Sequence, residues 1–263
     1  MVIKNVRDFV YQLTGNYYSE DRLHSLKQKA AQMLKDKGII SSVNEVDGKL
    51  EVLLRDKELA DELISYITIN ETSFFRHIDQ INTFKDHFLK DILKNPTGKV
   101  LSAGCSTGEE PYTLAMISLS IQPTLRNKRI FGIDISTRAL NVAKKGEYPA
   151  RYERYIPKEY KKYVEIDGRT LKIKDEVKKI VDFHKGNLVA SQCMYKGQFS
   201  AVFFRNVLIY FTEEKKRKAL ENLHKSLKKD GVLVLAPTET VGIKNQDLFE
   251  PFKIGRFVFF RKK

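Results

Sequence analysis

The chain has 263 residues, and its 47 lysines and arginines against 33 acidic residues give a net charge of +14, which fits an acidic partner or simply a soluble surface. Two cysteines, Cys105 and Cys193, exclude a disulfide framework and suit a reducing compartment. No apolar run approaches the roughly 20 residues of a membrane span and no signal-peptide pattern begins the chain, so we expect a cytoplasmic protein without direct membrane insertion.

Residues 2 to about 90 have the apolar periodicity of helices. The signals are an apolar face on Val6–Leu13 ended by Gly15, a cap at Ser19 for Leu23–Leu34, a cap at Asp56 for Leu59–Ile67, and an apolar run at Ile78–Leu93. The turn residues 95–98 then break the pattern. We therefore predict an all-α N-terminal domain at 1–94 and a second domain at 95–263.

Between the third and fourth of these helices lies a polar and aromatic segment, 70–76, without clear periodicity. Phe74 and Phe75 are expected to pack between the two domains. Whether Asn70, Thr72 and Arg76 also face a ligand is left open by the pattern.

A short apolar run at Val100–Ala103 meets Gly104 and Gly108, which indicates a strand, a tight loop and a helix. One glycine of the dinucleotide fingerprint is missing, and Glu109 and Glu110 at the helix start would repel a pyrophosphate. They would attract the sulfonium and ammonium groups of S-adenosylmethionine. Alternatively, either glutamate only complements the helix dipole, a reading we favour for Glu110.

A second apolar run ends at Asp134 and is followed by Ser136, a plausible helix cap. In a nucleotide-binding sheet, an acid at this position accepts hydrogen bonds from ribose hydroxyls. A surface aspartate after a strand is the alternative. We predict a ligand role because the strand, the acid and the next helix all fall where the glycine loop requires them.

The alternation then lapses between about 147 and 184, where we expect a small antiparallel subdomain. Its clearest signal is a hairpin over 163–174, with Asp167-Gly168 suited to a type I′ turn, and Val177–Phe183 is a candidate third strand. The five histidines are scattered and no pair has ligand spacing, so we expect no metal site.

The strand and helix alternation resumes towards the C-terminus. The expected elements are a strand at Phe199–Phe204, a helix over 213–229 capped by Thr212 and ended at Asp230-Gly231, a strand at Val232–Leu235, and a last, antiparallel strand at Phe257–Phe260. Ligands bind at the carboxyl ends of such strands, which here carry Arg205-Asn-Val-Leu-Ile-Tyr-Phe211.

Four motifs in order now carry a family resemblance: Asn-x-Thr-x-Phe-Phe-Arg, Ser-Thr-Gly-Glu-Glu-Pro-Tyr, Gly-Ile-Asp and Arg-Asn-Val-Leu-Ile-Tyr-Phe. Together they resemble the CheR family of chemotaxis methyltransferases over essentially the whole chain. The resemblance implies an α/β fold, a doubly wound Rossmann-like methyltransferase sheet with a small antiparallel β-subdomain, preceded by the all-α domain.

The family transfers a methyl group from S-adenosylmethionine to glutamate side chains of chemoreceptors, leaving S-adenosylhomocysteine. By resemblance, Arg76 and Tyr210 lie near the transferred methyl. The implied cofactor site comprises Asn70, Thr72, Arg76, Glu109, Asp134, Asn187, Leu188, Arg205 and Asn206. An arginine can grip the incoming carboxylate or fix the cofactor, and the sequence does not decide between these roles.

The family's helical domain is thought to lie against the acidic methylation helices of the receptor, and Arg22, Lys27 and Lys29 flank the apolar stripe of the second predicted helix. Some members grip a receptor C-terminal pentapeptide through a Gly-x-Gly-Tyr loop, which this chain lacks, so we expect no tether. We also expect a monomer.

Two rival classes are weighed. A nucleic-acid methyltransferase of the amino-methylating kind would resemble others in an Asn/Asp-Pro-Pro-Tyr stretch where this chain has Arg205-Asn-Val-Leu, so we expect no nucleic-acid partner. A non-catalytic S-adenosylmethionine-binding scaffold is disfavoured by the presence of both Arg76 and Tyr210.

Overall fold

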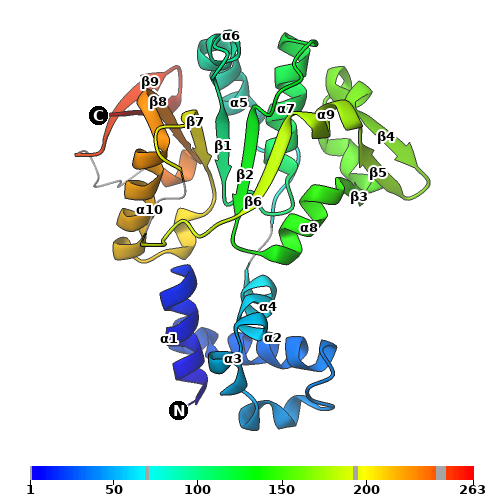
Figure 1. Cartoon of the computed structure of the whole chain (residues 1–263), viewed down its shortest axis with the longest axis vertical. Helices are drawn as coiled ribbons and strands as arrows, with labels where there is room; N and C mark the ends of the chain where they lie inside the picture. Colours follow the sequence, from blue (N-terminus) through cyan, green and yellow to red (C-terminus); the bar gives the residue numbers. More distant parts are fainter. Residues whose placement is uncertain (1, 69–70, 192–194, 241–246) are drawn as a thin grey trace.

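The computed structural model describes residues 2–68, 71–191, 195–240 and 247–263. Its N-terminal region is helical and lies at one end of a large sheet, below it in Figure 1. The elements of this region are α1 (Val2–Thr14), a 3-10 turn (Glu20–Arg22), α2 (Leu23–Asp36), a 3-10 turn (Val43–Gly48), α3 (Val52–Arg55) and α4 (Lys57–Ile67). They share an apolar core around Val10, Leu26 and Leu63.

The large sheet has seven strands in the order β6-β2-β1-β7-β8-β10-β9. Their bounds are β1 (Val100–Ala103), β2 (Ile130–Asp134), β6 (Val181–Lys185), β7 (Phe199–Phe204), β8 (Leu227–Leu235), β9 (Phe249–Ile254) and β10 (Phe257–Lys262). The strands from β6 to β8 are parallel, and β10 runs antiparallel to both β8 and β9. Because β2 and β6 lie on one side of β1 and β7 and β8 on the other, the strand order reverses beside β1, where ligands bind in open α/β sheets.

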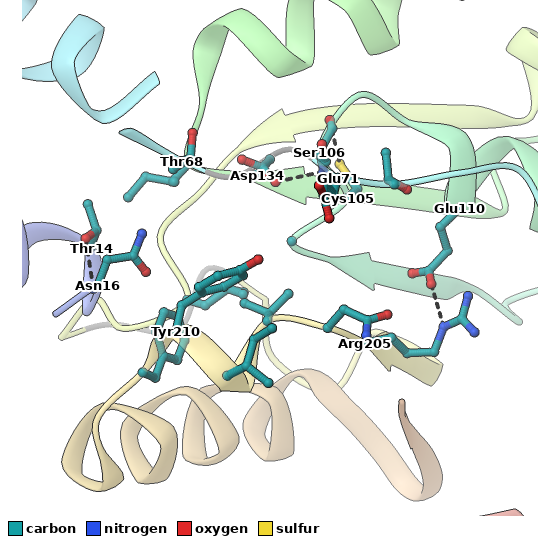
Figure 2. Close-up of a pocket in the computed structure, with 18 of the residues that line it drawn as sticks. Thr14, Asn16, Thr68, Glu71, Cys105, Ser106, Glu110, Asp134, Arg205 and Tyr210 are labelled. Carbon is teal, nitrogen blue, oxygen red and sulfur yellow. Dashed lines mark hydrogen bonds and ion pairs between the residues drawn. The ribbon is translucent and has the colours of Figure 1, made fainter. Parts of the chain in front are cut away.

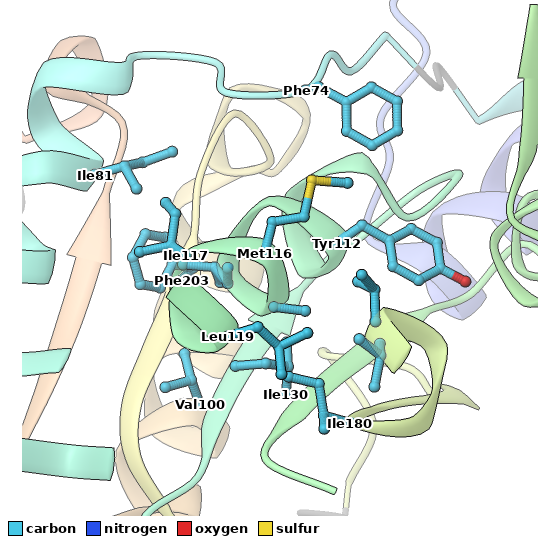
Figure 3. Close-up of a cluster of buried hydrophobic side chains, with 14 of the residues drawn as sticks. Phe74, Ile81, Val100, Tyr112, Met116, Ile117, Leu119, Ile130, Ile180 and Phe203 are labelled. Atoms are coloured by element: carbon cyan, nitrogen blue, oxygen red, sulfur yellow. The ribbon is translucent and has the colours of Figure 1, made fainter. Parts of the chain in front are cut away.

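Each strand alternates its side chains between two apolar cores, one on each face of the sheet. Val100 and Phe203 face the layer of α7 (Glu109–Ile121), as Figure 3 shows, whereas Leu101 and Phe204 face α10 (Glu213–Ser226). The first layer also holds α5 (Ile78–Phe84), a π turn (Lys85–Leu89) and α6 (Lys90–Lys94). α8 (Thr137–Lys145) covers the end of the sheet next to β2 and β6.

The fold class predicted from the sequence is confirmed, including the small antiparallel sheet, which has the order β3-β5-β4. Its strands are β3 (Glu147–Pro149), β4 (Val164–Asp167) and β5 (Thr170–Ile173), with 3-10 turns at Ala150–Tyr155 and Lys158–Tyr163. The hairpin turn differs by one residue from our prediction. Asp167 pairs with Thr170, so Gly168 and Arg169 form the turn, and only Gly168 has a positive φ, +58°.

Several predicted helix ends are corrected by the structure. Asp56 does cap α4, since its carboxylate accepts the N–H groups of Glu58 and Leu59 at 2.8 and 3.1 Å. Ser19 instead precedes the short 3-10 turn and makes no side-chain cap. The helix predicted over 213–229 ends at Ser226, because Leu227 already pairs with Phe199 across a bulge that contains Asp230 at φ +60°.

Two further differences concern the order of elements. The segment Val177–Phe183, predicted as the third strand of the small antiparallel subdomain, begins within the short helix α9 (Asp175–Lys179), and β6 starts only at Val181. β6 belongs to the large sheet, parallel to β2, and the third strand of the small sheet is β3 instead. The predicted boundary at 95–98 also moves. The helices over 78–94 pack on the sheet, with Phe84 edge-on to Phe203 at 4.8 Å, so the break between the two cores falls between α4 and α5.

Candidate active site

A pocket opens at the carboxyl ends of β1, β2, β6 and β7, on the side where the helical region lies (Figure 2). Its hollow measures about 1190 Å³ including the open space at its mouth. The predicted site residues that line it are Thr72, Arg76, Asp134, Asn187, Leu188, Arg205, Asn206 and Tyr210. Asn70 lies outside the described residues.

The loop after β1 forms one wall of this pocket through Gly104, Cys105 and Ser106. Gly104 has φ +74°, and a Cβ there would lie 2.6 Å from the Cγ2 of Val207. The loop therefore passes too close to the turn after β7 for any side chain at this position. Gly108, at φ +95°, then begins α7.

Asp134 ends β2 inside the pocket, with its carboxylate held by the backbone. The N–H of Ser106 donates to one oxygen at 2.8 Å, and the N–H of Ser136 donates to the other at 2.9 Å. Burial raises the pKa of this carboxyl, while the backbone hydrogen bonds act in the opposite direction. Carboxylate oxygens fixed in this way can accept two ribose hydroxyls.

A buried ion pair joins Glu110 on α7 to Arg205 at the end of β7. The Arg205 Nε lies 2.7 Å from Glu110 Oε2, and the side chains are only 2% and 14% exposed. Arg205 also donates to the main-chain oxygen of Arg76 at 2.9 Å, and Ser102 donates to the second Glu110 oxygen at 2.7 Å. Arg205 thus lines the pocket, but its charge is bound within the protein.

The two glutamates of α7 have places opposite to those we predicted. Glu110 lines the pocket, whereas Glu109 does not line it and is only 2% exposed. The Thr107 hydroxyl donates to the Glu109 carboxylate at 2.7 Å, and burial raises the pKa of this group to about 7. Successive residues on a helix point about 100° apart, which places the two carboxylates in different surroundings.

Arg76 reaches the pocket from a strained turn. Its neighbours Phe75 and His77 have φ values of +55° and +56°, which non-glycine residues rarely adopt. Packing holds the turn, since the Phe75 ring stacks on Tyr160 at 4.9 Å and the Phe75 N–H donates a hydrogen bond to Thr113 Oγ1 at 3.0 Å. Such strain at a pocket wall is typical of functional sites.

Tyr210 also lines the pocket, from the 3-10 turn Leu208–Tyr210 (Figure 2). Burial and the charge of Glu71 raise the pKa of its hydroxyl, and the charge of Arg76 lowers it. The two predicted catalytic residues therefore both line the pocket, and they are close enough for the charge of Arg76 to act on the Tyr210 hydroxyl.

The lining residues that sequence reasoning missed include Thr14 and Asn16, at the end of α1. Asn16 forms an isolated antiparallel bridge with Phe211, and the Asn187 side-chain amide donates to the main-chain oxygen of Leu13. The partners are 195 residues apart in the first contact and 174 residues apart in the second, and no local sequence pattern predicts such contacts.

The predicted docking residues on and before α2 differ in their surroundings. Arg22 is exposed, and Lys27 pairs with Asp47 at 2.6 Å. Lys29 is partly buried and donates to the main-chain oxygen of Ile67 at 3.2 Å, and burial lowers its pKa. One donor of the Lys29 ammonium group is thus used at the C-terminal end of α4, and the docking role predicted for the three cations stays a prediction.

Within the described residues, no cluster of three histidine, cysteine or acidic side chains could hold a metal ion. In the same part of the chain, every helix is too short or too polar to cross a bilayer.

Comparison with known proteins identifies the family. Residues 70–258 match the model of the CheR methyltransferase S-adenosylmethionine-binding domain. A chemotaxis protein methyltransferase of Borreliella burgdorferi is 34% identical over 92% of this chain and 89% of its own length. The chemotaxis protein methyltransferase 2 of Vibrio cholerae is 30% identical over 89% of this chain and 84% of its own length.

Similarity to solved structures is weaker. The N-methyltransferase NodS of Bradyrhizobium japonicum, in complex with S-adenosyl-L-homocysteine, is 14% identical with a TM-score of 0.42, covering 73% of this chain and 89% of that chain. The sequence matches therefore carry the assignment. The pocket belongs to an S-adenosylmethionine-dependent methyltransferase, and the chain is a member of the CheR family.

Proposed function

We propose that this enzyme methylates glutamate side chains of chemoreceptors, forming γ-glutamyl methyl esters. The observation that carries this proposal is the family membership, since the relatives are chemotaxis protein methyltransferases. The pocket agrees with it because Arg76 and Tyr210 are among the residues that line it. The proposed substrates are the cytoplasmic methylation helices of the receptors, and the enzyme acts in the cytoplasm as a monomer.

When bound, S-adenosylmethionine supplies the methyl group, which passes from the sulfonium sulfur to a carboxylate oxygen. A glutamate with a pKa of about 4.3 is already an anion at neutral pH, so no general base is needed. The protein's task is to align the carboxylate with the sulfur and to exclude water. We assign the alignment to Arg76 and Tyr210, which both line the pocket and interact electrostatically.

The cofactor contacts follow from the same geometry. We assign Asp134 to the ribose of the cofactor. We assign the backbone around Ser106 and the segment at Thr72 to the amino-acid end of the cofactor. Asn187, Leu188 and Asn206 complete the set as pocket-lining residues. Arg205 is proposed to act by holding Glu110 and the turn of Arg76 in place. Asn70 stays in the proposed set on the motif alone.

The test incubates the protein with methyl-labelled S-adenosylmethionine and receptor cytoplasmic fragments. Esters release their label as methanol in mild alkali, so we expect volatile label from the receptor and none from added RNA. Label on RNA would instead favour the nucleic-acid alternative. A protein that binds the cofactor and transfers no label would favour the scaffold alternative.

Recognition of the receptor is proposed to use the N-terminal region, with Arg22, Lys27 and Lys29 as the docking cations, of which Arg22 is exposed and Lys27 is partly exposed. A C-terminal receptor tether is not part of the proposal. The two-residue turn at Gly168 and Arg169 leaves little loop to clasp an added peptide strand, although the edge of β4 carries exposed residues such as Ile166.

A further inference from the structure

We infer that Asn16, at the end of α1, is a cofactor-binding residue that reads the adenine base, so that the N-terminal helix forms a wall of the cofactor site. The inference concerns the cofactor and does not depend on which acceptor the enzyme methylates. Two observations carry it: the way in which α1 is fixed against the methyltransferase domain, and the position of the Asn16 amide.

The end of α1 is joined to the methyltransferase domain on two sides of the pocket. On one side, the Asn187 amide donates to the main-chain oxygen of Leu13. On the other, Asn16 bridges to Phe211, and the hydroxyls of Tyr11 and Thr212 lie 2.9 Å apart. The end of α1 thus spans the pocket from the residues after β6 to the turn after β7.

A glycine permits this crossing. Gly15 has φ +78°, and a Cβ there would lie 3.3 Å from both Phe211 and Lys215. The chain can therefore leave the helix, turn sharply and pass close against the other domain, which delivers Asn16 to the pocket.

The side chain of Asn16 is half-buried and lines the pocket, and Figure 2 shows its amide turned toward the interior. Its backbone N–H donates to Thr14 Oγ1 at 3.0 Å. Across the described ranges of the chain, no protein group bonds to the side-chain amide itself. A half-buried amide with an unused donor and an unused acceptor is suited to a polar ligand.

The order of the strands indicates which part of the cofactor meets this amide. The glycine loop follows β1, Asp134 ends β2, and Asn187 follows β6, the next strand outwards. With the ribose at Asp134, the base lies beyond it, toward Asn187 and Leu13, the α1 residue that accepts the Asn187 hydrogen bond three residues before Asn16. An asparagine amide pairs with adenine by accepting from the amino group and donating to a ring nitrogen. Asn187 is less suited, because its amide already bonds to Leu13 and to the N–H of Val189 at 3.0 Å.

Calorimetry on the full chain tests this with two ligands, S-adenosylhomocysteine and its inosine analogue, which has an oxygen in place of the amino group. Asn16→Ala should weaken S-adenosylhomocysteine binding about tenfold, as expected for one or two lost hydrogen bonds. It should weaken binding of the analogue less, so that the preference for adenine falls. The matched control Asn44→Ala, on the exposed 3-10 turn Val43–Gly48, should leave both affinities unchanged.

Unchanged S-adenosylhomocysteine affinity in Asn16→Ala would overturn the inference, and so would an equal loss for both ligands. The ratio of the two affinities is measured within each variant, so a general loss of stability does not imitate the expected result. If Asn16→Ala does not fold, Asn16→Ser provides the same comparison.

Discussion

Glu109 is a buried carboxyl whose pKa is raised to about 7, and this makes the stability of the protein depend on pH. The folded protein keeps the proton up to about pH 7, whereas the unfolded chain releases it near 4.5. The unfolded state therefore binds fewer protons between these values, and the free energy of unfolding falls as the pH rises through them. The shift corresponds to at most about 3 kcal/mol.

Glu109→Gln should remove this dependence. In urea unfolding we expect the variant to gain stability relative to the parent between pH 5 and pH 8, because an amide has no proton to lose. Glu165→Gln, on the exposed part of β4, is the control and should follow the parent at both pH values. A parallel fall in the parent and Glu109→Gln would mean that another group causes the dependence.

Arg205 belongs to a network that does not tolerate the loss of its charge. Arg205→Ala leaves Glu110 buried without its partner, which typically costs about 3–5 kcal/mol. Arg205→Lys should recover only part of this, because an ammonium group on a different stem cannot reach both Glu110 and the Arg76 oxygen as the guanidinium does. Chemical denaturation of the three proteins measures the order, and equal stability of all three would contradict it.

For single residues, the sequence predicted which residue types form the site better than it predicted which way their side chains point. Asp134 could be predicted because its position after a strand already defines where its carboxylate points. Glu109 and Glu110 could not be separated, because the choice depends on how α7 is rotated on the sheet. The positions of Thr14 and Asn16 in the pocket could not be predicted, because they depend on a contact with Phe211 that forms only in the folded chain.

Among the elements, the loop after β1 depends strongly on a glycine at position 104. Gly104→Ala would place a methyl group 2.6 Å from Val207 and impose a positive φ on alanine. We expect calorimetry to show at least a tenfold loss of S-adenosylhomocysteine affinity, because the loop and Val207 both line the pocket. Gly38→Ala is the matched control, since Gly38 also has a positive φ, +70°, but faces open space. Equal affinities in the two variants would contradict this account of the loop.

The small sheet leads to a prediction about tethering. Titration of the isolated receptor C-terminal peptide should show no saturable binding, and removal of that tail should leave methylation rates unchanged, because the turn after β4 has only two residues. Micromolar peptide binding that maps to residues 163–184 would contradict the prediction.

Elements whose bounds depend on residues close in sequence were predicted well. Elements whose bounds depend on pairing between distant strands were not. The α4 cap is a contact between neighbours in sequence, so the sequence alone predicts it. The early start of β8 depends on its bulged pairing with β7. β9 was missed because its interior contains Pro251 and polar residues, a composition that only its edge position in the sheet permits.

For the whole molecule, we propose that the positively charged helical region recognises an acidic receptor helix electrostatically. Arg22→Glu should raise the KM for receptor severalfold at low salt, and the effect should fade as salt is added, because exposed charges are screened. Lys253→Glu, an equal charge change on the far edge of the sheet, is the control. Equal KM values for both variants at low salt would remove Arg22 from the docking surface.

The central claim is that this pocket transfers a methyl group to glutamate carboxylates of a receptor. The most direct measurement is tandem mass spectrometry of a receptor cytoplasmic fragment after reaction with S-adenosylmethionine and the enzyme. The account predicts methyl groups on glutamate side chains only, and their loss after mild alkali. Methyl groups on lysine, arginine or histidine, or alkali-stable methylation of the fragment, would contradict it.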